Sequence, residues 1–178
     1  MALKYPEQGY VQGMAPLAAT LLCYAPEEKS FVMMTRLWDR CGMKYFFLPK
    51  FQGLMSAFNE LEDLLLHYDV GKVLERAGIK PAFFAPRWYL CMFNNVLPFS
   101  TQLRIWDMVT FVLDEFVVFL HAVSLTLLDG LYKQLIKADS SEIMAHLTGR
   151  INVIDDDEFM RRVQRLWNEL MTTKKNTA

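Results

Sequence analysis

Gly9-Tyr10-Val11-Gln12-Gly13-Met14 leads directly into an apolar run that continues to Tyr24. The run has apolar residues on most faces of a helix, which predicts a helix over residues 10–24 that packs on several sides. Gln12 stands at the entrance of this helix. Its side chain offers a carbonyl acceptor and an amide donor, so it can hold a water molecule through both groups at once. Spacing alone leaves open a simpler interpretation, in which Gln12 only caps or begins the helix.

The rest of the chain also indicates helices. Residues 52–68 have the apolar spacing of an amphipathic helix, and the acidic residues 155–158 are typical of a helix N-terminus. An aromatic segment at 45–51 is expected to be a loop. No segment alternates with period two and no heptad persists, so we predict a single all-α domain, an irregular multi-helix stack over residues 1–171. The polar residues 172–178 are expected to form a disordered tail. The other expected helices span about 26–41, 70–77, 82–93, 102–113, 115–137 and 139–149.

Composition excludes some classes of partner. The chain has 178 residues and a formal net charge of −1, so it has no basic surplus and a nucleic-acid partner is not expected. Hydrophobic residues make up 53% of the chain, and the mean hydropathy is +0.12. Three widely separated cysteines, Cys23, Cys41 and Cys91, favour reduced thiols in a cytosolic setting.

The sequence offers no clear membrane or targeting signal. Residues 1–8 are too polar for the apolar part of a signal peptide. The most apolar stretch, Phe116 to Leu128, has about 13 residues, whereas a helix needs roughly 20 to cross a bilayer. We therefore expect a buried core helix there and no transmembrane segment.

Metal and hydrolase motifs are missing from the sequence. His67, His121 and His146 are isolated, so we expect no metal site, and His121 is expected to be a core histidine with its polar atoms satisfied. No zinc-protease, serine-hydrolase or phosphate-loop motif occurs. The acidic run 155–158 lacks the glycine and the alternating ligands of a calcium loop.

The residues 9–14 resemble the Y-x-Q-G-M motif of the TBC domain, the catalytic domain of Rab GTPase-activating proteins. A second run is similar to the W-F-x-x-x-F, L-P and R-I-W-D segments of the same family, in order and spacing. The resemblance covers roughly residues 5–135, and Phe31–Leu37 also matches. The residues of the second run are Phe84-x-x-x-Trp88-Tyr89-x-x-x-Phe93, Leu97-Pro98 and Arg104-Ile105-Trp106-Asp107.

The resemblance implies an activator of GTP hydrolysis rather than an enzyme with substrate chemistry of its own. Gln12 would be the glutamine finger that orients the attacking water, with Tyr10 and Gly13 setting its backbone. A Rab-type small GTPase would be the partner and would carry GTP and Mg²⁺, so no cofactor of the chain's own is implied. The protein would be cytoplasmic, or peripheral at endomembranes through its partner.

The remaining motif residues have structural expectations. Trp88 and Trp106 match family positions and are expected to be core aromatics. Arg104 and Asp107 are three residues apart on one expected helix and are predicted to pair with each other.

The chain departs from the family at the arginine finger. That residue lies in an I-x-x-D-x-x-R motif well before Y-x-Q, but only eleven residues precede Gln12 and none is arginine. At Ile154-x-x-Asp157 the arginine position holds Met160. No arginine finger is found, because the conceivable substitutes Arg36, Arg40 and Arg87 are better explained as cations on helix surfaces.

Three hypotheses follow from this departure. In the first, the chain, which resembles the C-terminal part of a TBC domain, is an N-terminally truncated TBC domain that activates GTP hydrolysis, with this activity impaired because the arginine finger is missing. Alternatively, it is a non-catalytic Rab-binding or scaffold module in membrane trafficking, or a fragment or incomplete gene product whose full form carries the arginine. Because helix 10–24 is apolar nearly all round, we also expect a homodimer or a partner chain to cover its exposed face.

Overall fold

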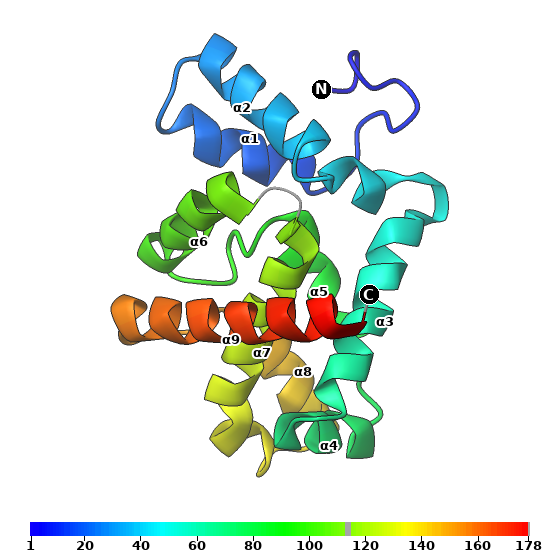
Figure 1. The fold of residues 1–178 in the computed structure, drawn as a ribbon, viewed down its shortest axis with the longest axis vertical. Helices are drawn as coiled ribbons and strands as arrows, with labels where there is room; N and C mark the ends of the chain where they lie inside the picture. Colours follow the sequence, from blue (N-terminus) through cyan, green and yellow to red (C-terminus); the bar gives the residue numbers. More distant parts are fainter. Residues whose placement is uncertain (113–114, 178) are drawn as a thin grey trace.

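The structure is a computed structural model that describes residues 1–112 and 115–177, and these ranges contain helices and no strand. The predicted all-α fold is therefore confirmed (Figure 1). The helices are α1 (Met14–Leu22), α2 (Glu27–Asp39), two 3-10 turns η1 (Met43–Phe47) and η2 (Pro49–Phe51), α3 (Gln52–Leu65), α4 (Asp69–Arg76), α5 (Pro81–Leu90), α6 (Phe99–Val112), α7 (Phe116–Leu135), α8 (Ser140–Thr148) and α9 (Asp156–Thr177).

The helices form an irregular stack. α1 and α2 pack side by side at one end of the molecule, and α4 lies toward the other end (Figure 1). α9 packs along α7 and also contacts α6, while α5 contacts α3 and α8. From α2 the contacts continue through η1 to α3, and from α3 to α5 and α7.

Large aromatic side chains from α5 and α6 fill the centre of this stack. Trp88 is fully buried, and its Nε1 donates a hydrogen bond to the carbonyl oxygen of Leu147 at 3.2 Å. Trp106 is also buried, and its Nε1 donates to the carbonyl oxygen of Met92 at 3.0 Å. Both tryptophans are core aromatics as predicted, and each hydrogen bond satisfies a donor that burial would otherwise leave unpaired.

The apolar helix α7 lies within the helix predicted over about 115–137 and contains the 13-residue apolar stretch. It has 20 residues, and by length and composition alone it could cross a membrane. However, 72% of its most apolar window is buried inside the protein, against neighbours that include α4 and α9. A helix that is apolar all round is typical of a core position as well as of a membrane span, and here the packing accounts for it.

The C-terminal residues differ from the prediction. Instead of a disordered tail from residue 172, α9 continues to Thr177. The hydroxyls of Thr172 and Thr173 donate to the carbonyls of Asn168 and Glu169, four residues earlier. Lys174 forms an ion pair with Glu115 at 3.5 Å, and a lysine in the last turn complements the helix dipole. A polar composition therefore did not prevent the helix from extending.

A chain of polar side chains, buried except at Glu60, joins three helices. Ser124 Oγ donates to Tyr89 Oη at 3.4 Å, Tyr89 Oη lies 2.8 Å from His121 Nδ1, and His121 Nε2 lies 3.3 Å from Glu60 Oε2. If Tyr89 donates to Nδ1, then Nε2 carries the proton and donates to the Glu60 carboxylate, so every partner is satisfied. His121 is the satisfied core histidine that the sequence predicted. The hydrogen bond from His121 lowers the pKa of the Glu60 carboxyl.

Tyr89→Phe is expected to lower the free energy of unfolding by about 1–2 kcal/mol, because it leaves His121 Nδ1 buried without a donor. Chemical denaturation followed by circular dichroism measures the change. Tyr132→Phe is the matched control, since the described residues offer the Tyr132 hydroxyl no hydrogen-bond partner. Equal losses in both variants would contradict a specific role for the Tyr89 hydroxyl.

Candidate functional site

The loop before α1 depends on two glycines. Gly9 has φ 62° and Gly13 has φ 116°, both in the left-handed region that favours glycine. Gly13 occupies the N-cap position of α1, and no side chain caps this helix. Gln12 therefore does not cap the helix, so the interpretation of Gln12 as a helix cap is wrong.

The side chain of Gln12 is available to a partner. Gln12 is exposed, and within the described part of the chain its amide makes no hydrogen bond. Tyr10 is also on the surface, with 68% of its area exposed, so it does not anchor the loop in the core. The loop thus presents a tyrosine and a glutamine to solvent, two residues apart.

The backbone of the loop is fixed at Gly13. Gly13 is buried, and a Cβ placed on it would lie 3.4 Å from Leu90 Cβ and 3.7 Å from Cys91 Sγ. The end of α5 therefore supports the loop directly behind Gln12. Burial also raises the pKa of the Cys91 thiol, so this cysteine stays protonated beside the loop.

A further contact under α1 was not predicted from the sequence. The amide of Asn94, in the loop between α5 and α6, donates to the carbonyl oxygen of Pro16 at 2.9 Å and to Thr20 Oγ1 at 3.0 Å. The amide of Gln102 donates to the same hydroxyl at 3.3 Å. In the sequence, Asn94 is marked only as a polar residue near aromatic ones. This does not indicate which helix its amide contacts.

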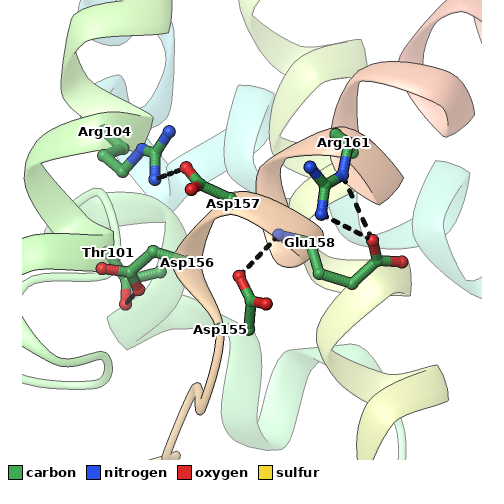
Figure 2. A network of polar contacts seen from close by, with 7 residues as sticks. All are labelled: Thr101, Arg104, Asp155, Asp156, Asp157, Glu158 and Arg161. Carbon is green, nitrogen blue, oxygen red and sulfur yellow. Dashed lines mark hydrogen bonds and ion pairs between the residues drawn. The ribbon is translucent and has the colours of Figure 1, made fainter.

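The predicted pairing of Arg104 with Asp107 is wrong. Arg104 instead pairs with Asp157 in the first turn of α9, next to a hydrogen bond from Thr101 to Asp156 (Figure 2). α6 contacts α9, so a carboxylate on another helix lies closer to Arg104 than the one three residues along. Arg104 therefore joins α6 to α9, and its ion pair does not involve the loop of residues 9–13, which we name the glutamine loop.

The same network fixes the start of α9. Asp155 Oδ1 accepts a hydrogen bond from the backbone N–H of Glu158 at 2.9 Å, and Glu158 pairs with Arg161 at 3.1 Å (Figure 2). The backbone hydrogen bonds lower the pKa of the Asp155 carboxyl. The acidic run is the helix N-terminus that the sequence predicted.

The carboxylate that pairs with Arg104 can be identified by double-mutant cycles. We expect a coupling of about 0.5 kcal/mol between Arg104→Gln and Asp157→Asn at low salt, as for exposed ion pairs, and less in high salt. Arg104→Gln and Asp107→Asn should be additive. Urea unfolding of the single and double variants measures both couplings. A coupling confined to Asp107 would contradict the structure.

A groove of about 700 Å³ lies between α1, α2 and α6, and we name it the α1–α2–α6 groove. Its lining is mainly apolar and includes Leu21, Leu37, Met92, Leu103 and Trp106, together with Asp107.

Two of the candidate arginines belong to this groove. Arg36 and Arg40 lie one turn apart on its α2 wall and form no ion pair with the described residues. The groove meets α1 at Thr20 and Leu21, which is the end of the helix opposite Gln12. The third arginine, Arg87, donates to the carbonyl oxygens of Thr148 at 3.0 Å and Asn95 at 3.3 Å. Arg87 therefore has a structural role.

Residues 1–136 match the model of the Rab-GTPase-TBC domain family. A TBC domain-containing protein of Schizosaccharomyces pombe is 41% identical over 174 residues, which are 96% of this chain and 42% of that protein. The Rab GTPase-activating protein tbc-11 of Caenorhabditis elegans is 33% identical over 140 residues, or 75% of this chain and 14% of that protein. Carabin of Mus musculus is 35% identical over 109 residues, or 57% and 23% of the two chains.

A solved structure has the same fold. The crystal structure of the Ypt/Rab-GAP domain of Gyp1p superposes with a TM-score of 0.82 and 18% identity, covering 97% of this chain and 63% of that one. The chain thus spans less than two thirds of that domain, and less than half the length of the relatives named above.

Proposed function

The chain belongs to the Rab-GTPase-TBC domain family, and from this premise we propose that it acts on Rab-type small GTPases as a GTPase-activating module whose glutamine finger is Gln12. One observation supports the proposal most directly. Gln12 is exposed, makes no hydrogen bond with the described residues, and sits on a loop whose backbone is fixed at the buried Gly13.

GTP hydrolysis requires a polar group that orients the attacking water, and an exposed glutamine can be that group. Hydrolysis of GTP depends on orienting the attacking water and stabilising the charge that develops on the phosphoryl group. A glutamine amide can accept from the water and donate toward the phosphate oxygen at the same time. In this proposal the partner GTPase holds GTP and Mg²⁺, and the chain supplies the side chain that orients the water.

The charge of the transition state needs a second group. An arginine supplied in trans can contribute about 10³–10⁵ in rate. No arginine precedes Gln12 in the sequence, and Arg36 and Arg40 line a groove at the other end of α1. We infer that this chain alone accelerates hydrolysis weakly.

The alternative is a non-catalytic Rab-binding module. The hydrogen bonds of Arg87 favour it, because they tie this exposed guanidinium to the backbone carbonyls of Thr148 and Asn95. In either case we propose a cytoplasmic protein that reaches endomembranes through its GTPase.

One experiment separates the two functions. Single-turnover GTP hydrolysis by a panel of Rab GTPases is measured with and without the chain, and binding to the same panel is measured in parallel. Binding with acceleration supports the activating module. Binding without acceleration supports the non-catalytic module, and the absence of both contradicts the proposal.

We also propose that a second copy or a partner chain covers the exposed side of α1. Ala15, Ala19, Leu22 and Cys23 are exposed on or directly after this helix, and the α1–α2–α6 groove lies beside it. Contiguous apolar surface of this kind favours association. Analytical ultracentrifugation and binding of an apolar dye test this proposal. A monomer at high concentration that binds no dye would contradict it.

A further inference from the structure

Three polar side chains meet beneath α1, of which Thr20 and Gln102 are buried and Asn94 is half-buried. Thr20 comes from α1, Asn94 from the loop between α5 and α6, and Gln102 from α6. Thr20 is 6% exposed and Gln102 is 1% exposed, and Leu17 and Met92 nearby are fully buried. Polar groups in such surroundings are costly unless they are hydrogen-bonded, so the geometry of their contacts specifies how the elements dock.

Asn94 makes the contacts that reach the first turns of α1. Its Nδ2 donates to the Pro16 carbonyl at 2.9 Å and to Thr20 Oγ1 at 3.0 Å. Thr20 Oγ1 itself lies 3.2 Å from the Pro16 carbonyl, to which it donates. The Pro16 carbonyl and the Thr20 hydroxyl come from successive turns of α1 and converge on the one amide nitrogen of Asn94.

The loop that carries Asn94 is held in place by the protein around it. Met92, Phe93 and Asn95 have φ values of 48°, 60° and 60°. Left-handed backbone at residues other than glycine is strained and persists only where its surroundings enforce it. The enforcing contacts are hydrogen bonds from Phe93 N to the Trp88 carbonyl at 2.8 Å and from Trp106 Nε1 to the Met92 carbonyl at 3.0 Å.

The glutamine loop is thus supported at two places from one segment of chain. Gly13 lies against Leu90 at the end of α5. The carbonyl oxygen of Pro16 accepts a hydrogen bond from Asn94, which is four residues after Leu90. α1 cannot turn or slide on this support without breaking the Asn94 contacts. Gln12 precedes Gly13 directly, so its position follows that of α1.

We propose that Asn94 is a positioning residue for Gln12, acting through α1 and Gly13. The inference rests on the proposed function in so far as Gln12 has a catalytic task. Displacement of a reacting group by about 1 Å can cost about 10²-fold in rate, so a side chain remote from the chemistry can control it.

The test uses two variants and a control. Asn94→Leu keeps a similar volume and removes both hydrogen bonds, and Thr20→Val removes the shared hydroxyl while leaving the Pro16 contact. Asn59→Leu makes the same chemical change at an exposed position of α3. The first readout is the NMR cross-relaxation between the Gly13 α protons and the Leu90 side chain, with the shift of the Gln12 side-chain amide.

The expected result is loss of the Gly13–Leu90 signal and a shifted Gln12 amide in Asn94→Leu, a smaller effect in Thr20→Val, and no change in Asn59→Leu. The second readout is single-turnover hydrolysis by a responding Rab GTPase. The maximal rate in excess of that of the GTPase alone is expected to fall about tenfold or more in Asn94→Leu, with the half-saturating concentration of the chain unchanged, because orientation of water acts in the transition state.

The outcomes are distinguishable. If the unaltered chain accelerates no GTPase, the proposed function fails, while the NMR readout still decides whether Asn94 positions Gln12. Retention of the Gly13–Leu90 signal in a folded Asn94→Leu overturns the inference, as does loss of the signal with an unchanged maximal rate in a responding pair. If Asn94→Leu does not fold, an unchanged signal and Gln12 amide shift in Thr20→Val overturn it.

Discussion

Gln12→Ala is expected to abolish the acceleration of GTP hydrolysis, so that the rate falls to that of the Rab GTPase alone, because removal of one preorganised group can cost about 10²–10³ in rate. The reason is geometric. The alanine side chain can neither accept a hydrogen bond from the attacking water nor donate one to the phosphate. Single-turnover hydrolysis by a responding Rab GTPase measures the effect.

The fold should not change in this variant. Gln12 is exposed and makes no hydrogen bond with the described residues, so the free energy of unfolding should stay within about 0.5 kcal/mol of the original. Gln52→Ala, an exposed glutamine at the start of α3, is the control and should leave the rate unchanged. Gln12→Glu keeps the length of the side chain and removes the amide donor. Full activity in Gln12→Ala would exclude a glutamine finger.

Gly71→Ala is expected to lower the free energy of unfolding by about 3 kcal/mol. In most helices alanine is more stable than glycine by about 1 kcal/mol, so the sign here depends on packing. A Cβ on Gly71 would lie 1.9 Å from the backbone carbonyl oxygen of Leu65. Backbone cannot move aside as a side chain can, and α4 would have to shift away from α3.

Gly130→Ala is the matched control for this prediction. Gly130 lies within α7, is exposed, and would have no atom within 4 Å of an added Cβ. This variant should gain about 0.5–1 kcal/mol from helix propensity alone. Urea unfolding followed by circular dichroism compares the two variants. Stabilisation of both by the same amount would show that α4 does not pack closely on the end of α3.

The periodic helices could be predicted because their pattern is local. Leu54, Phe58, Leu61 and Leu65 have the expected spacing and are all buried in α3. The aromatic segment 45–51 was expected to be a loop and instead forms much of η1 and η2. Lys50 and Phe51 have positive φ there, a conformation that these residue types do not indicate. Tertiary packing, and not local sequence, determines the backbone conformation of such a segment.

The candidate site was predictable only in part. The motif identified Gln12 and Gly13, and the left-handed φ of 116° at Gly13 gives that glycine a physical reason. The sequence predicts that Arg104 pairs with Asp107, because spacing on one helix is visible in it, whereas the approach of Asp157 on another helix is not. Asn94 could not be found because its partners on α1 lie in a distant part of the chain.

The hydrogen bond from Asn94 to the Pro16 carbonyl joins residues 78 positions apart. Closing a loop of this length costs more conformational entropy than a contact between consecutive helices does. Such non-local contacts therefore form late in folding. On a ribosome that adds about 5–20 residues per second, Asn94 is synthesised about 4–16 seconds after Pro16. A nascent chain that ends before α5 therefore contains the complete glutamine motif but lacks the support that fixes it.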